Sequence, residues 1–516
     1  MSPVTGRGGA GARGHTRLRS IVPDLALIAA TVSLFYALFL FEGYQKLFRD
    51  SDAGWHIRTG ESILATGHLP RADPYSFTRA GAPWFAWEWG SDVLMGAVHR
   101  SLGLTGVAFL YGLAIAAGVW LWFRLNWIAG GNFLFACVLA APMLSTASIH
   151  WLARPHVLSW LFLLGTVMFA EKFHGSLTWK HAATIFTLTA LWTNLHASFF
   201  LGPLILATYA AGALLRRAIW DDTVVCSSKP LAVAALVAAA ASLVNPYGWH
   251  LHQHVLRYLT DAALLDRIGE FQSFNFHAEG AFQIILALGI AMIGAVVALG
   301  QKNIARFLLS VGISALALRS ARALPLVALL LLPLANGSIA QALSSARDLH
   351  QGLRRTLDDF LNYSKNLRVL DARGSGLAWA PLIAIAALGF LRIPVMAART
   401  GFPPDQFPVA AASAIESLPE SARILAPDKF GGYLIYRFEG RRKVFFDGRS
   451  DLYGAEFLKQ YARLVQVRPG WREQLQAFQF TNALLPNDYS LVPALEQLGW
   501  TRVYRDSVAT LLATPR

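Results

Sequence analysis

The sequence predicts an α-helical polytopic membrane protein with about eleven transmembrane helices, followed by a small extracytoplasmic α/β domain. Hydrophobic residues make up 55% of the 516 residues and charged residues only 15%, a composition typical of a chain that faces lipid. Apolar runs recur throughout the first three quarters of the chain, and the remainder is more polar. We therefore expect a basic cytoplasmic N-terminus (1–20), a transmembrane domain (21–396) with a first extracytoplasmic loop (42–102), and an extracytoplasmic α/β domain (397–516).

The expected membrane helices follow from the apolar runs, because a bilayer is crossed by about 20 largely apolar residues. This rule places helices near residues 21–41, 103–123, 132–149, 157–172, 182–195, 199–215, 230–244, 281–300, 306–319, 323–340 and 376–396. No convincing small-residue cleavage site follows the first run, so we expect it to remain as a helix.

The distribution of positive charge predicts how these helices are oriented across the membrane. The net charge is +14, but Lys and Arg occur in short clusters between apolar runs rather than along one stripe, which favours membrane topology over nucleic-acid binding. If the basic N-terminus is cytoplasmic, alternate connections and the long 341–375 segment carry the basic clusters. The first loop and everything after residue 397 then lie on the other side.

Unusual polar motifs collect in the connections on that other side. They are the first loop, HWLARPH (150–156), NLHASF (194–199), the 245–280 segment with NPYGWHLHQH and EFQSFNFH, and RSAR (319–322). Ionisable residues at the ends of several membrane helices are costly unless they line a wet cavity or a site. We therefore expect these motifs to converge on one functional face.

The first loop contains the most suggestive cluster. In a helix begun near Asp50, the side chains of Asp52, His56 and Thr59 would share one face, with Arg58 alongside. An acid, an imidazole and a guanidinium could then point together. The alternative is that the two aspartates only cap the helix and that the charges are solvated.

Three tryptophans follow in the same loop. Trp84, Trp87 and Trp89 are typical of a segment that lies at the headgroup level of a bilayer, so we expect them to anchor the loop on the membrane.

A wider pattern of motifs adds a family resemblance. The pattern comprises Asp52, Trp55-His56, Gly60, Gly67, Pro70, Asp73-Pro74, Ser76, Thr78, Gly81, Trp84, Glu88-Trp89, Arg154-Pro155-His156, Asn194-Leu195-His196, Asn245-Pro246-Tyr247-Gly248 and Phe446-Asp447-Gly448-Arg449. It resembles a group of bacterial GT-C-like proteins over nearly the whole chain. The GT-C superfamily consists of integral-membrane glycosyltransferases that use polyprenyl-phosphate-linked sugars, among them oligosaccharyltransferases and protein mannosyltransferases.

The resemblance implies a function. It implies transfer of a sugar from a polyprenyl-phosphate-linked donor to an acceptor glycan, lipid or protein on the outer side of the bacterial cytoplasmic (inner) membrane. Membrane lipids are then partners and nucleic acid is not. Two other functions stay open: a lipid-carrier or polysaccharide transporter (flippase), and a non-catalytic membrane assembly protein.

The resemblance also assigns residues. Asp52, with Asp50 second, matches the first-loop acid that serves as general base or metal ligand. Substrate contacts are expected from His56, Arg58, Glu88, Arg154, His156 and His196, most of which could supply positive charge to the departing phosphate.

A metal is left open. The sequence lacks the WWDYG-type motif of oligosaccharyltransferases and a second acid pair, so a divalent cation (Mg or Mn) would rest on Asp52 if on any residue. Glu88 and Glu270 are either ligands or polar boundary residues, and the boundary interpretation is favoured for Glu270.

Single motifs allow plainer interpretations. Arg154 beside Pro155 can bind phosphate or simply anchor a helix end, and a lone histidine such as His196 is more often structural. For Asp447-Gly448-Arg449 a turn with a salt-bridged arginine is favoured.

The last quarter of the chain predicts alternating strands and helices. We expect a strand, a Gly-Gly turn and a short helix in ARILAPDKFGGYLIYRF (422–438), and strands in RKVFFDGR (442–449) and FTNALLPND (480–488). A helix is expected in SLVPALEQLG (490–499) and a hairpin in the final segment, WTRVYRDSVATLLAT (500–514).

Overall fold

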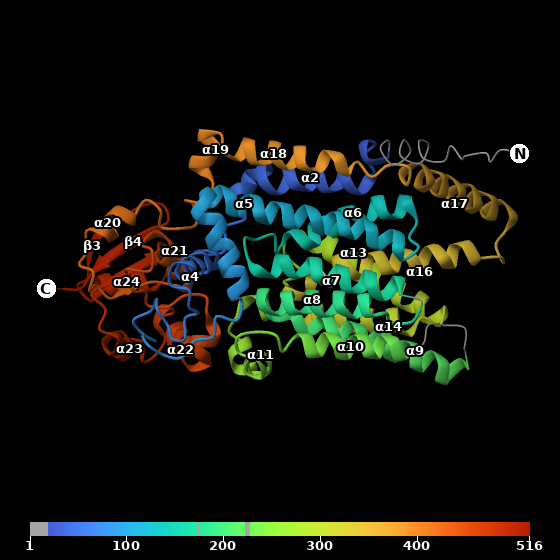
Figure 1. Ribbon diagram of the computed structural model, residues 1–516. Helices are drawn as coiled ribbons and strands as arrows, with labels where there is room; N and C mark the ends of the chain where they lie inside the picture. Colours follow the sequence, from blue (N-terminus) through green and yellow to red (C-terminus); the bar gives the residue numbers. More distant parts are fainter. Residues whose placement is uncertain (1–18, 174, 222–227, 516) are drawn as a thin grey trace, which may run out of the picture.

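The computed structural model describes residues 19–173, 175–221 and 228–515. Long helices run side by side in a bundle, and a small domain with the β-sheet covers one end (Figure 1). Of the expected basic N-terminus, residues 1–18 lie outside the described residues.

Each apolar run chosen from the sequence contains a helix in the structure. These are α2 (Leu25–Phe39), α5 (Trp89–Ile128), α6 (Phe133–Ser148), α7 (Pro155–Lys172), α8 (Trp179–Leu195), α9 (Leu201–Trp220), α10 (Ser228–Ala241), α13 (Ala281–Gly300), α14 (Ile304–Arg319), α16 (Leu332–Ser345) and α18 (Ala380–Leu391). Within the described residues, five helical stretches are long and apolar enough to cross a membrane: Arg19–Lys46, Trp89–Ile128, Ala197–Trp220, Ala281–Gly300 and Ala321–Ser345. The protein is a multi-pass membrane protein.

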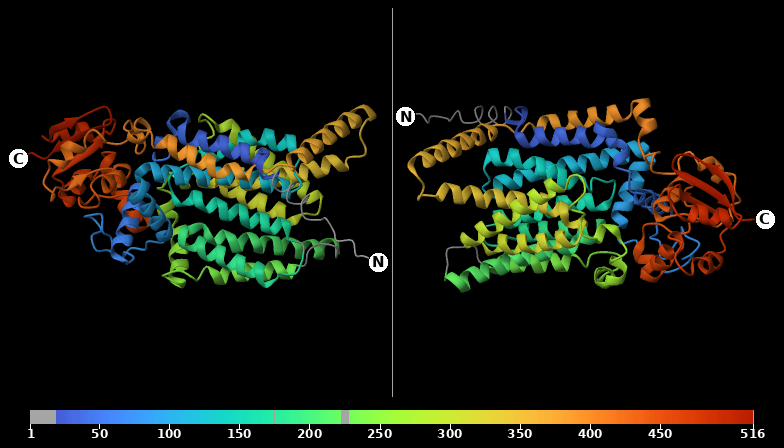
Figure 2. Two further views of the ribbon diagram at one scale, coloured as in Figure 1. Left: turned by 45° about the horizontal axis from the view of Figure 1, so that its top comes forward. Right: turned by 180° about the vertical axis from the view of Figure 1, so that it is seen from behind.

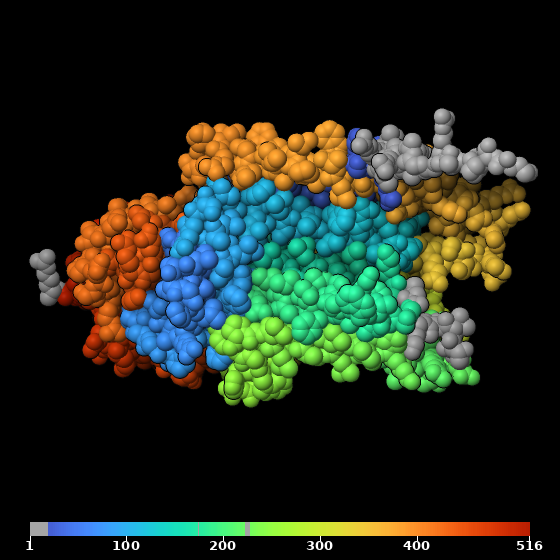
Figure 3. Space-filling view, in the orientation of Figure 1, coloured from blue at the N-terminus to red at the C-terminus, as the bar shows by residue number. Residues whose placement is uncertain are grey.

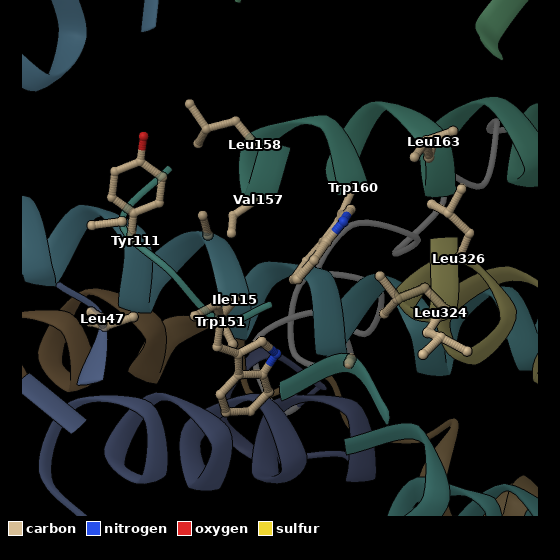
Figure 4. Packing of buried hydrophobic residues seen from close by; sticks show 14 of the residues in the cluster. Leu47, Tyr111, Ile115, Trp151, Val157, Leu158, Trp160, Leu163, Leu324 and Leu326 are labelled. Carbon is tan, nitrogen blue, oxygen red and sulfur yellow. The ribbon is translucent and has the colours of Figure 1, made fainter. Parts of the chain in front are cut away.

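The bundle packs around large buried side chains (Figure 4). Tyr111 and Ile115 of α5 lie near Val157 and Trp160 of α7, and Tyr111 is completely buried. Between helices in a bilayer such packing stabilises through van der Waals contact rather than through transfer from water.

One end of the bundle carries α17 (Gln351–Asp371). This helix holds several of the basic residues of the 341–375 segment, which was expected to be a mere connection and is largely helical. Its Asp371 accepts a hydrogen bond from Leu25 at the start of α2. The C-terminal domain covers the opposite end in all views (Figures 1 and 2), so the basic segment and this domain are separated as the charge pattern predicts.

The first loop folds into two further helical pieces. α4 (Asp52–Thr66) comes first, and α5 begins at Trp89 and is broken at Gly103, so its first part belongs to the loop. Short helices α11 (Trp249–Thr260) and α12 (Ala262–Leu265) lie in the 245–280 segment, and α19 (Pro394–Arg399) precedes the C-terminal domain.

The C-terminal domain has a four-stranded sheet in the order β1-β2-β4-β3. Its strands are β1 (Ile424–Leu425), β2 (Asn482–Pro486), β3 (Thr501–Arg505) and β4 (Ala509–Ala513), and its helices are α20 (Ala412–Glu416), α21 (Asp428–Arg437), α22 (Ser450–Val465), α23 (Trp471–Phe478) and α24 (Leu491–Gln497). β1 and β2 are parallel, whereas β2–β4 and β3–β4 are antiparallel. This confirms the strand near 482, the helix near 491 and the terminal hairpin.

Two sequence expectations for this domain were wrong. Gly431 and Gly432 do not form a turn but lie inside α21, because this helix approaches other backbone too closely for a side chain. A Cβ at Gly432 would lie 2.5 Å from the Ser51 carbonyl oxygen. The segment expected to be a strand at 442–449 forms only an isolated bridge, since Val444 pairs with Tyr75 and Phe77 of the first loop rather than with the sheet.

These contacts attach the domain to the first loop. The space-filling view shows the orange and red C-terminal domain directly against the blue first loop (Figure 3). α21 packs on α4 where glycines from both helices meet, with Gly54 against the backbone of Gly432. The site described next lies at this junction.

Candidate active site

Asp52 lies at the start of α4, with only 6% of its surface exposed. Asp50 Oδ1 accepts a hydrogen bond from the Asp52 backbone N–H at 2.9 Å, whereas the N-cap position of α4 is Ser51, whose side chain makes no capping hydrogen bond. Asp52, His56 and Thr59 are all buried along one face of α4, as the helical spacing predicts. The Asp52 carboxylate is free of capping and points toward another helix end.

Arg154 is the centre of the charged cluster. It occupies the N-cap position of α7, where an extended backbone precedes Pro155. Its guanidinium lies 2.7 Å from Asp50 Oδ2, 2.8 Å from Asp52 Oδ2 and 3.1 Å from Glu270 Oε1. Three carboxylates from two distant segments therefore share one arginine.

A second arginine extends the cluster. Arg322 lies 2.8 Å from Glu270 Oε2, so Glu270 joins the guanidinium groups of Arg154 and Arg322. The side chain of Arg322 is 38% exposed, compared with 14% for Arg154. The expectation that Glu270 is only a boundary residue is not supported, since it pairs with both arginines.

The carboxylates of this cluster differ in proton affinity. Burial raises the pKa of Asp52 to about 7, against the opposing effect of Arg154 and with a further upward contribution from Asp50. For Glu270, burial acts in the same direction, but Arg322 and Arg154 outweigh it and lower the pKa. Asp52 is thus able to gain and lose a proton near neutral pH, which suits a general base.

The cluster does not fit a divalent cation. The oxygens of Asp50, Asp52 and Glu270 that come together are already directed at the Arg154 guanidinium, which is permanently charged. A metal ion would have to displace it. Among the residues that the structure describes, no group of three or more His, Cys, Asp or Glu side chains is arranged to hold a metal ion.

A second cluster of acids and imidazoles adjoins the first. Glu88 lies between two histidines, 3.3 Å from His196 Nε2 and 3.7 Å from His56 Nε2. His56 Nδ1 in turn lies 2.5 Å from Asp92 Oδ1, and both of these side chains are almost completely buried. Burial raises the pKa of Glu88 to about 7 and lowers the pKa of His196 to about 3.

His156 connects the two clusters in space. It follows Arg154 by two residues, and its ring centroid lies 6.4 Å from that of His196. His156 Nε2 is 2.9 Å from the His150 carbonyl oxygen, so it donates a hydrogen bond there. The structure thus brings together seven of the eight residues predicted for the site.

Arg58 is the exception. Its guanidinium lies 2.5 Å from Glu61 Oε2 and donates to the carbonyl oxygen of Tyr436 at 2.8 Å. It also stacks over the Tyr436 ring, at 4.7 Å from the centroid. Arg58 therefore contributes to the packing of α4 on α21, on a different face of α4 from Asp52.

The Asp447-Gly448-Arg449 motif reaches the site from the C-terminal domain. Arg449 forms buried ion pairs with Asp447 at 2.7 Å and with Asp73 of the first loop at 2.8 Å, which confirms the salt-bridged turn. Gly448 packs directly on Asp52, because a Cβ there would overlap Asp52 Oδ1. Absence of a side chain at residue 448 is what lets the domain lie on the carboxylate.

A cavity of about 700 Å³ opens beside this contact. Gly448 and Asp447 line it together with Gly269 of the 245–280 segment. Its charged lining includes Asp266, Arg267, Asp428, Lys459 and Arg468. Burial raises the pKa of Asp428. The cavity thus extends to Gly448, the residue that packs on Asp52, while Asp52 is not part of its lining.

Of the three tryptophans expected to anchor the first loop on the membrane, Trp84 is buried inside the protein, whereas Trp87 and Trp89 are partly exposed. Trp84 is 4% exposed and lies under Arg449, with 4.6 Å between the guanidinium and the ring. Trp87 packs against His254 and Tyr258, and Trp89 Nε1 donates to Asn194 at 2.8 Å. Their rings fix the loop to the rest of the protein because the C-terminal domain and the 245–280 segment cover it.

Sequence reasoning missed three members of these clusters: Asp92, Arg322 and Asp73. Asp73 belongs to the motif pattern of the family resemblance and Arg322 to the RSAR motif, but neither residue was predicted to have a role in the site. Asp92 gave no signal beyond an acid among apolar residues of α5.

No protein-family model matches the sequence, and no curated protein sequence matches it. The structure is nevertheless similar to an oligosaccharyltransferase of Archaeoglobus fulgidus tethered to an acceptor peptide, with a TM-score of 0.52 and 12% identity over 89% of this chain and 68% of that chain. A structure of the archaeal oligosaccharyltransferase from the same organism with an inhibitory peptide and a dolichol-phosphate gives a TM-score of 0.53 and 11% identity over 93% and 70%. At this identity the similarity defines the fold alone. The fold is GT-C-like, which confirms the expectation from the motifs.

Proposed function

We propose that the protein is a membrane glycosyltransferase that moves a sugar from a polyprenyl-phosphate-linked donor to an acceptor on the outer side of the bacterial cytoplasmic membrane. The observation that carries this proposal is Asp52, a buried carboxylate with a pKa of about 7, held by Arg154 next to a polar cavity. The fold supports it, because a similar fold occurs in the archaeal oligosaccharyltransferase.

Asp52 is the general base in this mechanism. An acceptor hydroxyl or amide in the cavity gives its proton to Asp52 as the acceptor attacks the anomeric carbon of the sugar. Gly448 lines the cavity and packs on Asp52, and the proposal is that the acceptor reaches the carboxylate past this glycine. A single displacement of this kind inverts the configuration at the anomeric carbon.

Arg154 and Arg322 are proposed to bind the phosphate of the donor. The two guanidinium groups converge on one carboxylate, that of Glu270, and charge-assisted hydrogen bonds to a phosphate have the same geometry. The donor phosphate would take the place of Glu270 between them. Their positive charge then stabilises the negative charge that develops on the departing phosphate.

The acceptor is proposed to be polar. The cavity lies between the C-terminal domain and the 245–280 segment, and charged residues of both signs line it. A glycan or a peptide segment matches this lining better than a lipid chain. Membrane lipids surround the bundle, where many leucines and isoleucines are exposed.

The transfer is proposed to need no divalent cation, because Arg154 already supplies the positive charge among the three carboxylates. Purified protein treated with EDTA should keep its transfer rate. A rate that falls on chelation and returns with Mg²⁺ or Mn²⁺ would show that this part of the proposal is wrong.

The central test uses purified protein, a polyprenyl-phosphate-linked sugar and a peptide or glycan acceptor. Asp52→Asn and Asp52→Ala should both reduce transfer by at least about 100-fold, since each removes the base. The exposed Asp405 of the C-terminal domain provides a control, and Asp405→Asn should transfer like the wild type. Undiminished transfer by both Asp52 variants would remove Asp52 from the chemistry.

The same experiment separates the two alternative functions. Vesicles that move a lipid-linked sugar across the membrane without forming any transfer product would favour a transporter. The cavity that reaches Gly448, on which Asp52 packs, favours a ligand-binding protein over a purely structural assembly protein.

A further inference from the structure

The short helix α11 has an unusual distribution of side chains. Neighbours three and four apart on a helix share a face, so the 12 residues of α11 divide into three strips. The inner strip is buried against the protein and contains Leu251 and Val255. The second strip is polar and exposed, and it consists of His250, Gln253 and Arg257.

The third strip of α11 is apolar and yet exposed. It consists of Trp249, which is 62% exposed, Leu256, which is 63% exposed, and the exposed Leu259. Large apolar side chains that gather on one exposed face are unfavourable in water and mark a surface that contacts something else. This apolar strip therefore needs a partner.

The Trp249 side chain is held in its exposed position. Its ring stacks on the His252 ring, with 5.2 Å between the centroids and 11° between the planes. His252 Nε2 in turn lies 2.8 Å from the hydroxyl oxygen of Ser242, which follows the end of α10. A tryptophan fixed in this way contacts a partner with little further loss of side-chain freedom.

The surroundings of α11 identify the partner as lipid. Leu236 of the apolar helix α10 is exposed, and so are Leu243 and Val244 between α10 and α11. The apolar strip thus continues the lipid-facing surface of the bundle. α11 also lies across the end of this surface, since it is seen nearly end-on in Figure 1, where the long helices run lengthwise.

We propose that α11 is an interfacial helix whose apolar strip lies at the boundary between headgroups and acyl chains, on the side of the C-terminal domain. A helix with protein-facing, apolar and polar strips meets protein, lipid and water together, as occurs at a membrane surface. The amphipathic ring of Trp249 suits this depth, and Arg257 on the polar strip can extend toward lipid phosphate. This assignment is independent of the chemistry proposed at Asp52.

The protein-facing side of α11 connects the membrane contact to the C-terminal domain. His254 Nε2 lies 3.1 Å from Asp451 Oδ2, and the hydroxyl oxygens of Tyr258 and Ser450 are 3.2 Å apart. Asp451 and Ser450 begin α22, and Ser450 also lines the cavity. An α11 fixed in the bilayer surface therefore holds the start of α22, and this wall of the cavity, close to the membrane.

A spin label tests the membrane contact directly. Leu256→Cys is labelled in full-length protein in which serine replaces Cys137 and Cys226, and the protein is reconstituted in phospholipid vesicles. Oxygen concentrates in the hydrocarbon, whereas a nickel chelate stays in water. The ratio of oxygen to nickel accessibility should be several-fold higher for this label than for one at Gln253→Cys on the polar strip.

Val503→Cys is the matched control for this measurement. Val503 is also an exposed apolar residue, at 50%, but it belongs to β3 of the C-terminal domain. Its label should give the low ratio of the Gln253→Cys label. If the label at Leu256→Cys gives the same low ratio, α11 does not lie in the bilayer and the assignment is overturned.

Hydrogen exchange tests whether this contact holds α22. In vesicles, Leu256→Glu should raise the amide exchange of residues 450–453 several-fold, because a charge on the apolar strip is expelled from the bilayer. Gln253→Glu adds the same charge to the polar strip and should leave the exchange unchanged. Unchanged exchange in Leu256→Glu overturns the holding role, and an equal increase in both variants overturns its dependence on lipid.

Discussion

Replacement of Gly448 by alanine should inactivate the proposed site. Gly448 belongs to the C-terminal domain, and the added methyl group would collide with Asp52 of the first loop. The Cβ of an alanine there would overlap Asp52 Oδ1 and lie 2.7 Å from Asp52 Cγ, whereas ordinary contacts begin near 3.4 Å. The carboxyl group or the segment that carries Gly448 must therefore shift by about 0.7 Å or more, the difference between these two distances. The backbone at Gly448 is not left-handed, so the effect is steric alone.

The expected cost follows from that displacement. Asp52 is held at 2.8 Å from Arg154, and a shift of this size weakens the pair and moves the base away from the acceptor. A misplacement of about 1 Å in a catalytic group lowers the rate by roughly 100-fold. Overpacking also costs roughly 1–3 kcal/mol of stability, a loss that leaves most of the protein folded.

The assay compares Gly448→Ala with Gly269→Ala. Both glycines line the same cavity, but a Cβ at Gly269 meets open space, so this variant controls for any change of the cavity wall. Transfer of the lipid-linked sugar is measured together with the melting temperature. Gly269→Ala should transfer within about twofold of the wild type and Gly448→Ala roughly 100-fold more slowly. If a folded Gly448→Ala transfers at the wild-type rate, the position of the Asp52 carboxylate does not matter and the reasoning fails.

Three further predictions concern the charged groups. Asp52 has a raised pKa, so its burial favours the protonated folded state. Asp52→Asn should therefore melt increasingly above the wild type as the pH rises from about 4 to 7, with a constant difference at higher pH; equal melting temperatures at pH 8 would contradict this. Arg154→Met removes the group that lowers the pKa of Asp52. The pH at which the transfer rate falls on the acid side should therefore move above 7. If this pH does not change, Arg154 does not act on the base. Arg449→Met leaves Asp447 and Asp73 buried without their cation and should lower stability by roughly 3–5 kcal/mol in a thermal or denaturant melt; a melting temperature within 1–2 °C of the wild type would count against this role.

Much of the fold could be predicted from the sequence alone. Apolar length is set by the bilayer, so each predicted membrane segment contains a helix in the structure. The charge pattern likewise separated the 341–375 segment from the C-terminal domain. Helical spacing placed Asp52 and His56 on one buried face, because neighbours three and four apart on a helix share a side. Local spacing and lipid exposure act within short stretches of chain, and such stretches can be read without a structure.

Other features came only from the tertiary structure. In the sequence, Arg58 and Arg154 are equivalent candidates for a positive charge at the site. In the structure, Arg58 donates to the Tyr436 carbonyl oxygen of α21, whereas Arg154 pairs with Asp52. Glu270 belongs to the site because the 245–280 segment brings it to both arginines. The glycines at 431–432 lie in a helix because α4 packs closely against them. Glu88 lies between His56 and His196 because the first loop and the end of α8 meet in the fold. Sequence determined which residues reach this end of the bundle, whereas packing between segments far apart in the chain decided their partners, and with them which acid keeps its proton near neutral pH.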